Sequence, residues 1–276
     1  MLNRFSPSKR WLYPLLTLAM VLTLTLGQPI VAQAISWADL IRSGIQAVQL
    51  ANLSDRQEVQ LGQQINAELV GRQVRLYRGA SINQYVNEIG QRLAAQSSRP
   101  QIPYRFQVVD DNSVNAFATM GGFVYVNTGL LRLADNEAQL ASVMAHEIGH
   151  IAGRHAVNQM KEMAIASGAA GALGMNRNAA VSIGVDLALR RPNSRQSEYE
   201  ADQLGLRTLG RAGYAESAMV DFMGKLLRQS AVPTFLSTHP ATNERINRLR
   251  QGLQTAPNSG DGLDTAAYRS RIRTLL

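Results

Sequence analysis

The stretch His146-Glu147-Ile148-Gly149-His150 carries the clearest chemical pattern in the 276-residue sequence, and it lies in a segment with helical spacing of apolar residues. At about 100° per residue, His146 and His150 lie about 40° apart around the helix, and Glu147 lies within about 100° of both. Two imidazoles four residues apart can bind one Zn²⁺, and the carboxylate between them can take a proton from an attacking water. The stretch therefore predicts a helix with two zinc ligands and a general base. Asp135 is its expected N-cap, with Glu137 in the first turn.

A zinc site needs a third protein ligand, which must be His, Asp or Glu because the chain has no cysteine. If the helix simply continued, His155 would lie about 180° from His146, so a helix-end or packing role is favoured for His155. Glu198 and Asp202 are four residues apart on one predicted helix face. One of them can complete the metal site while the other accepts the free N–H of a ligand histidine, and Glu198 is the better ligand candidate. Glu200 lies on a different face and is expected at the surface or in packing.

The composition indicates a globular protein without disulfides. Apolar residues make up 45% of the chain, and the formal net charge of +8 is spread along the sequence without basic runs. No nucleic-acid-binding motif or base-stacking aromatic array is present, so nucleic acid is not expected as a partner.

The first 34 residues have the pattern of a secretory signal peptide. A positively charged start precedes an apolar run from Leu15 to Leu26, and Ala32-Gln33-Ala34 offers small residues at the cleavage positions. The apolar run is about 16 residues even when counted from Trp11, short of the ~20 needed to span a bilayer. We therefore expect cleavage after Ala34 and export to the periplasm or beyond, with an uncleaved membrane anchor as the minor alternative.

The rest of the chain predicts a mainly helical α+β fold. Helical patterns cover 54–70 and 82–93, strand patterns follow at 104–109 and 123–126, and a turn cluster lies at 110–112. The two strands predict a small mixed sheet beside the helix that carries the histidines.

The C-terminal half continues with helices. One is expected from Asn193 or Ser194 to before Gly213, and another over 216–228. The Ala- and Gly-rich segment 164–185 is expected to be a packed or mobile hairpin, with a lid or membrane-touching flap as the alternative. We expect a single domain over 35–253, followed over 254–276 by a flexible link and a short basic tail.

Four ordered motifs within residues 54–252 together resemble the gluzincin metallopeptidase family of the HtpX heat-shock, CAAX prenyl, Oma-type and BepA-like proteases. The motifs are His146 to His150; Glu198-Tyr199-Glu200-Ala201-Asp202; Asn115-Ala116-Phe117 with Gly121-Gly122; and His239-Pro240 with Arg245. The resemblance implies a zincin-like fold and one zinc per chain. It implies His146, His150 and Glu198 as ligands, Glu147 as general base and Asp202 behind a ligand. Among these proteases the chain is nearest to the soluble, exported BepA-like branch, without a helical-repeat domain.

The remaining motifs have expected roles near the zinc. The strand formed by Phe123, Val124, Tyr125, Val126 and Asn127 is suited to pair with an extended substrate, unless it is an ordinary internal strand. His239 can stabilise the oxyanion or block the zinc as a fourth ligand, and the plain alternative is a histidine that anchors its loop. Arg245 can hold that loop or bring positive charge to the substrate carbonyl.

The resemblance and the export signal together imply an exported zinc-dependent endopeptidase. Its expected substrates are unfolded or misassembled envelope proteins. One alternative is a chaperone-like binder of unfolded chains with little or no proteolysis. Another is contact with a membrane surface through the Ala/Gly-rich segment and the basic tail.

Overall fold

The computed structural model describes residues 48–49, 53–166, 174–175, 177–240, 242–253 and 259–276. The chain divides into two compact units, Met1–Ile45 and Gln46–Leu276, and only the second contains described residues. The predicted signal peptide over residues 1–34 lies outside the described residues. Within the part of the chain that is described, no helix has the length and apolar character needed to cross a bilayer.

A three-stranded mixed sheet borders the site, as the α+β prediction requires. Strand β4 (Phe123–Asn127) is central: it pairs in parallel with β2 (Arg105–Val109) and antiparallel with β3 (Ala116–Thr119). The register places Phe123 opposite both Arg105 and Thr119. The prediction that Phe123, Val124, Tyr125, Val126 and Asn127 offer an exposed edge is therefore wrong, because both edges of β4 are occupied. The edge strands are β2 and β3, and the four residues of β3 were too few to predict a strand.

Gly121 and Gly122 make the tight turn from β3 to β4. Their φ angles are 78° and 99°, which lie in the region that disfavours residues with a Cβ. A Cβ on Gly121 would also lie 2.9 Å from the carbonyl oxygen of Glu58. The glycine pair therefore lets helix α3 (Asp55–Glu68) approach the turn.

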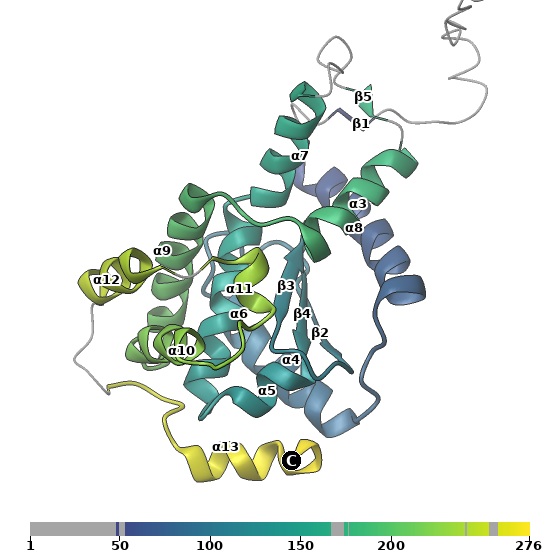
Figure 1. Cartoon of the computed structure of the whole chain (residues 1–276). Helices are drawn as coiled ribbons and strands as arrows, with labels where there is room; N and C mark the ends of the chain where they lie inside the picture. Colours follow the sequence, from purple (N-terminus) through teal and green to yellow (C-terminus); the bar gives the residue numbers. More distant parts are fainter. Residues whose placement is uncertain (1–47, 50–52, 167–173, 176, 241, 254–258) are drawn as a thin grey trace, which may run out of the picture. The chain divides into compact units, whose positions relative to one another are not determined.

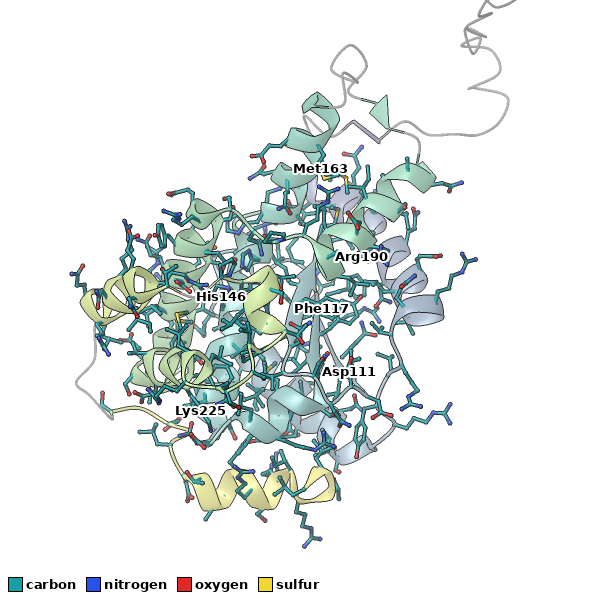
Figure 2. All side chains as sticks on the ribbon, in the orientation of Figure 1. Asp111, Phe117, His146, Met163, Arg190 and Lys225 are labelled. Carbon is teal, nitrogen blue, oxygen red and sulfur yellow. The ribbon has the colours of Figure 1, made fainter. Side chains whose placement is uncertain are left out.

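Helix α6 (Glu137–Ala152) carries the two histidines and lies between the sheet and helix α9 (Arg195–Arg211) (Figure 1). Its N-cap is Asn136 rather than the expected Asp135, because the Asn136 side chain accepts a hydrogen bond of 3.0 Å from the Gln139 amide. Asp135 instead makes an ion pair of 2.6 Å with Lys225. The apolar core surrounds α6, and Figure 2 shows the side chains around His146.

Helices α6 and α9 pack closely because glycines face the opposite backbone. A Cβ on Gly149 of α6 would lie 2.6 Å from the Ala201 carbonyl oxygen, and one on Gly205 of α9 would lie 3.0 Å from Ala145. Helix α9 begins after Ser194, whose side chain accepts from the Ser197 amide, as predicted. This close packing brings the first turn of α9 beside the histidines of α6.

The other elements complete the second unit. They are β1 (Val48–Gln49), η2 (Leu69–Gln73), α4 (Ala80–Ala94), α5 (Thr128–Leu133), α7 (His155–Ala166), β5 (Gly174–Met175), α8 (Arg177–Arg190), α10 (Ser217–Leu227), α11 (Phe235–Thr238), α12 (Asn243–Gly252), α13 (Thr265–Arg271) and η4 (Arg273–Leu275). Much of the segment predicted as a hairpin belongs to α7 and α8. Residues 167–173 and 176 lie outside the described residues, and a lid or flap there stays a prediction.

The C-terminal residues, which were expected to form a short basic tail after a flexible link, make specific contacts with the rest of the second unit. Tyr268 on α13 is buried and its hydroxyl donates to the Leu131 carbonyl at 2.6 Å. Arg132 donates to the carbonyl oxygen of Leu275 at 2.7 Å. Residues 265–276 therefore pack against α5, while 254–258 of the expected link lie outside the described residues.

Candidate metal centre

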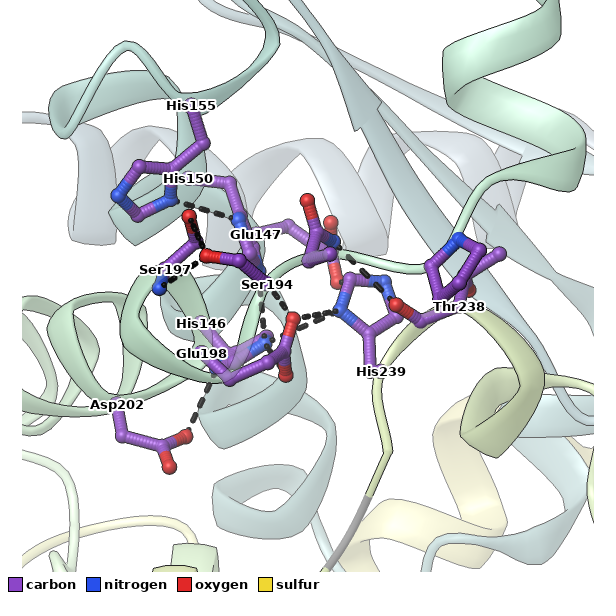
Figure 3. A network of polar contacts seen from close by, with 12 residues as sticks. His146, Glu147, His150, His155, Ser194, Ser197, Glu198, Asp202, Thr238 and His239 are labelled. Carbon is purple, nitrogen blue, oxygen red and sulfur yellow. Dashed lines mark hydrogen bonds and ion pairs between the residues drawn. The ribbon is translucent and has the colours of Figure 1, made fainter. Parts of the chain in front are cut away.

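Three side chains from two helices converge in one buried polar network (Figure 3). The Nε2 atoms of His146 and His150 on α6 lie 3.1 Å apart. Glu198, in the first turn of α9, places Oε1 3.3 Å from His150 Nε2 and Oε2 3.5 Å from His146 Nε2. All three side chains are buried. The structure thus brings together the three ligands that the resemblance implied.

His239 joins this group from the loop after α11. Its Nδ1 lies 3.3 Å from His146 Nε2 and 3.2 Å from Glu198 Oε1. The backbone amide of His239 donates to the Phe235 carbonyl at 2.9 Å, and the two rings stack with centroids 4.5 Å apart. The fold therefore holds the imidazole of His239 among the other donors, and each of the four residues offers one atom within 4.8 Å of the rest.

The donor set fits one zinc ion. Tetrahedral zinc with bonds of about 2.0–2.1 Å separates its ligand atoms by about 3.3–3.4 Å. The five separations quoted above, which involve both oxygens of Glu198, span 3.1–3.5 Å, and one donor atom from each of the four residues lies within 4.8 Å of the others. Three imidazoles and one carboxylate are also the donor types that zinc prefers when thiolates are absent.

Asp202 lies behind His146, as expected for a residue that orients a ligand. Its Oδ1 is 3.0 Å from His146 Nδ1, which leaves Nε2 of His146 directed at the donor set. Burial opposes protonation of His146, but hydrogen bonds to Asp202 and Glu198 outweigh it and raise the pKa of His146 to about 9. Burial lowers the pKa of His150 to about 4. The negative charges of Asp202 and Glu198 therefore favour the binding of a cation in this pocket.

Arg245 is fully buried and holds both carboxylates. It donates to Asp202 through Nε at 2.8 Å and Nη2 at 2.7 Å, and its Nη1 lies 2.6 Å from Glu198 Oε2. Nη1 also donates to the Pro240 carbonyl at 3.0 Å, one residue after His239. These contacts favour the alternative in which Arg245 holds the loop. Arg245 lines a small hollow with His146 and Asp202 and is not among the residues that line the cavity beside Glu147, so substrate contact by Arg245 stays a prediction.

Glu147 borders this cavity. Both of its carboxylate oxygens are buried without a hydrogen-bond partner among the described residues, and burial raises its pKa. A buried carboxylate with a raised pKa is suited to accept a proton, and His239 Nε2 lies 3.4 Å from Oε1 of Glu147. The cavity beside it is also lined by Phe117, Ala118 and Thr119 of β3, by His150 and His239, and by Gly184, Leu187 and Ala188 of α8.

His155 does not point away from the site, because helix α6 ends at Ala152. Arg154 has a φ of 56°, and this left-handed residue turns the chain so that α7 starts in a new direction at His155. Nδ1 of His155 lies 2.8 Å from Nδ1 of His150, on the side of that ring opposite the donor set. The expectation that His155 is not a ligand agrees with this geometry, but its expected direction was wrong.

Comparison with known proteins identifies the family. Residues 80–252 match the family described as Peptidase family M48. The chain belongs to this family. Membership in M48 makes it a zinc-dependent metallopeptidase, and the cluster of His146, His150, Glu198 and His239 is where it can hold one metal ion. The predicted family, zincin-like fold, enzyme class and cofactor are thereby confirmed.

The M48 chain is similar to several curated proteins. It is 32% identical to the beta-barrel assembly-enhancing protease of Escherichia coli (strain K12) over 94% of this chain and 56% of that protein. It is 34% identical to the putative beta-barrel assembly-enhancing protease of Vibrio cholerae over 69% of this chain and 43% of that protein. It is 34% identical to the mitochondrial metalloendopeptidase OMA1 of Saccharomyces cerevisiae over 56% of this chain and 48% of that protein. The chain thus spans about half the length of these relatives.

Proposed function

We propose that this M48 chain is an endopeptidase that hydrolyses peptide bonds in unfolded or misassembled proteins of the cell envelope. The observation that carries the proposal is Glu147, a buried carboxylate with no hydrogen-bond partner among the described residues, which lines the cavity together with the donors His150 and His239. A carboxylate in this position can accept a proton from the attacking water and then donate it to the leaving amine.

The proposed chemistry assigns one proton path to Glu147. When bound, zinc polarises the scissile carbonyl and lowers the pKa of the attacking water toward about 7. Glu147 accepts the proton of that water, and the protonated carboxyl then donates it to the leaving amine. His146, held by Asp202, and His150 and Glu198 supply the ligands.

His239 has two proposed roles that oppose each other. Its Nδ1 lies within the donor set, which supports a resting state in which His239 occupies the position that a substrate carbonyl would need. Rotated away from the donor set, the same imidazole would be free to donate to the developing oxyanion. The present contacts favour the first role.

The proposed substrate path runs along β3. Among the described residues this strand pairs with β4 alone, and Phe117, Ala118 and Thr119 line the cavity beside Glu147. An extended polypeptide can add to such an edge through main-chain hydrogen bonds, which demand little of its sequence. A photo-crosslinking residue at position 118 should capture an unfolded substrate, whereas one at position 107, half-buried on the opposite edge strand β2, should not. Equal capture at both positions would contradict this path.

The proposed compartment is the periplasm or another exported location. The signal-peptide pattern supports it, as does similarity to proteins whose name refers to β-barrel assembly. The mature protein should begin at Ile35 and be released with the periplasmic fraction. An intact N-terminus in the membrane fraction would instead support the anchor.

The enzymatic proposal is tested with casein or another unfolded protein as the substrate. Wild type should cleave it, and Glu147→Gln should keep the zinc but lose about 10²- to 10⁴-fold of the rate, the usual contribution of proton transfer. Unchanged cleavage by Glu147→Gln would remove Glu147 as the base. If neither protein cleaves and both suppress aggregation of an unfolded substrate, the chaperone-like alternative holds instead.

A further inference from the structure

His150 has an unusual partner behind it. The other zinc-ligand candidate on α6, His146, meets the carboxylate of Asp202 through its Nδ1. The Nδ1 of His150 instead meets the Nδ1 of another histidine, His155, at 2.8 Å, and both rings are buried. A contact of this length between two ring nitrogens requires one proton between them.

The arrangement of protons follows from the zinc site. His150 can bind zinc through Nε2 only if that atom carries no proton, so its neutral ring carries the proton on Nδ1. This N–H then donates to Nδ1 of His155, which must accept. The neutral His155 ring consequently carries its own proton on Nε2, which lies 3.4 Å from Oε2 of Glu200.

The backbone is shaped to make this contact. Arg154 adopts a left-handed φ of 56°, a conformation that is unfavourable for a residue with a side chain. Its side chain is tied down by an ion pair of 3.2 Å with Glu58 and a hydrogen bond to the Leu53 carbonyl. Gly153 leaves room for the ring, since a Cβ there would lie 2.5 Å from His155 Nε2. A helix that simply continued would not bring His155 to His150.

We propose that His155 is a positioning residue for the zinc site: it fixes the tautomer and ring orientation of His150, and Glu200 supports it from the surface. The inference rests on the zinc site of the proposed function. Partners of this kind that accept the free N–H of a ligand histidine typically change metal affinity by about 10- to 100-fold. The side chain of Glu200 is 51% exposed, so its contribution is expected to be the smaller one.

The test is the zinc affinity of the full chain, measured by competition with a chromophoric chelator. His155→Phe keeps a ring of similar size but has no acceptor, and should bind zinc about 10- to 100-fold more weakly. His155→Asn loses the ring but places an amide oxygen at the position of Nδ1, and should bind more tightly than His155→Phe. A role in packing alone predicts the opposite order, because Phe fills the space better than Asn.

Glu200 offers a second test, because substitution of this half-exposed side chain should leave the fold intact. Glu200→Gln should bind zinc more weakly than the control Glu162→Gln, which removes one exposed carboxylate from α7. In a double variant with His155→Phe, Glu200→Gln should cause no further loss of zinc affinity. The inference is overturned if folded His155→Phe binds zinc as tightly as wild type. If that variant does not fold, equal zinc affinities of Glu200→Gln and Glu162→Gln overturn it. Failure of wild type itself to bind zinc would refute the proposed site instead.

Discussion

Replacing Arg245 by methionine should destabilise the zinc-free protein more than any exposed arginine can. The guanidinium is 1% exposed and contacts two buried carboxylates, Asp202 and Glu198, at 2.6–2.8 Å. Arg245→Met keeps a long apolar side chain but leaves both carboxylates without this cation. The variant therefore isolates the charge that holds Asp202 and Glu198 in place.

The size of the effect follows from burial. Removing one partner of a buried ion pair costs about 3–5 kcal/mol, because the remaining charge is uncompensated. In a domain of this size 1 kcal/mol corresponds to roughly 2–4 °C in Tm, so the Tm should fall by roughly 6–20 °C. Bound zinc supplies a positive charge of its own, so the loss should be smaller in the zinc-loaded protein.

The effect should also depend on pH. Burial works against ionisation of Asp202, but its hydrogen bonds to Arg245 and His146 outweigh this and hold its pKa below the ordinary value of 3.8. A carboxylate whose folded-state pKa is lowered contributes stability that is fully present above its unfolded pKa. That contribution disappears as the pH falls through the folded pKa. The difference between wild type and Arg245→Met should therefore shrink as the pH falls through the acidic range in which Asp202 becomes protonated.

Thermal unfolding by circular dichroism in the presence of a chelator measures this difference. Arg248→Met is the matched control on the same helix: Arg248 pairs with Glu244 at 2.9 Å, but both side chains are about half exposed. Such a pair contributes about 1 kcal/mol or less. If Arg245→Met lowers the Tm no more than Arg248→Met does, the buried ion pair does not stabilise the site as argued.

Three further perturbations test other parts of the site. His239→Ala should raise the rate of cleavage of an unfolded protein if His239 blocks the zinc at rest, and a collapse of that rate would instead support oxyanion stabilisation. Gly149→Ala should force α6 and α9 apart, because its Cβ would meet the Ala201 carbonyl at 2.6 Å. In a urea titration, Gly149→Ala should lower the free energy of unfolding by about 1–3 kcal/mol. Gly71→Ala should not lower it, because a Cβ at Gly71 has no atom within 4 Å. Zinc at 100 times its Kd should stabilise the folded protein by about 2.7 kcal/mol, and an unchanged Tm would mean that no folded-state site is filled.

Much of the site could be predicted from local spacing. His146, Glu147 and His150 share a helix face because of the helical repeat alone. The spacing of Glu198 and Asp202 predicts a ligand and its neighbour by the same logic. Local signals also predict the helix starts: Ser54 forms the expected capping box with Gln57, and Ser194 caps α9. These features depend on residues within one or two turns of each other.

Features that depend on tertiary contacts could not be predicted in this way. Strand β3 is four residues long and exists because β4 pairs with it. The direction of His155 depends on Arg154, whose left-handed backbone is held by Glu58, almost a hundred residues away in the sequence. The role of Arg245 required knowing that α12 lies beside α9, which no spacing within α12 reveals.

The central claim is that α6 and α9 together bind one zinc ion through His146, His150 and Glu198. The most direct measurement is the zinc content per chain of purified wild type and Glu198→Ala after dialysis against a weak chelator. We predict about one zinc per chain in wild type and almost none in the folded variant. A full equivalent of zinc in Glu198→Ala, held as tightly as in wild type, would contradict the claim.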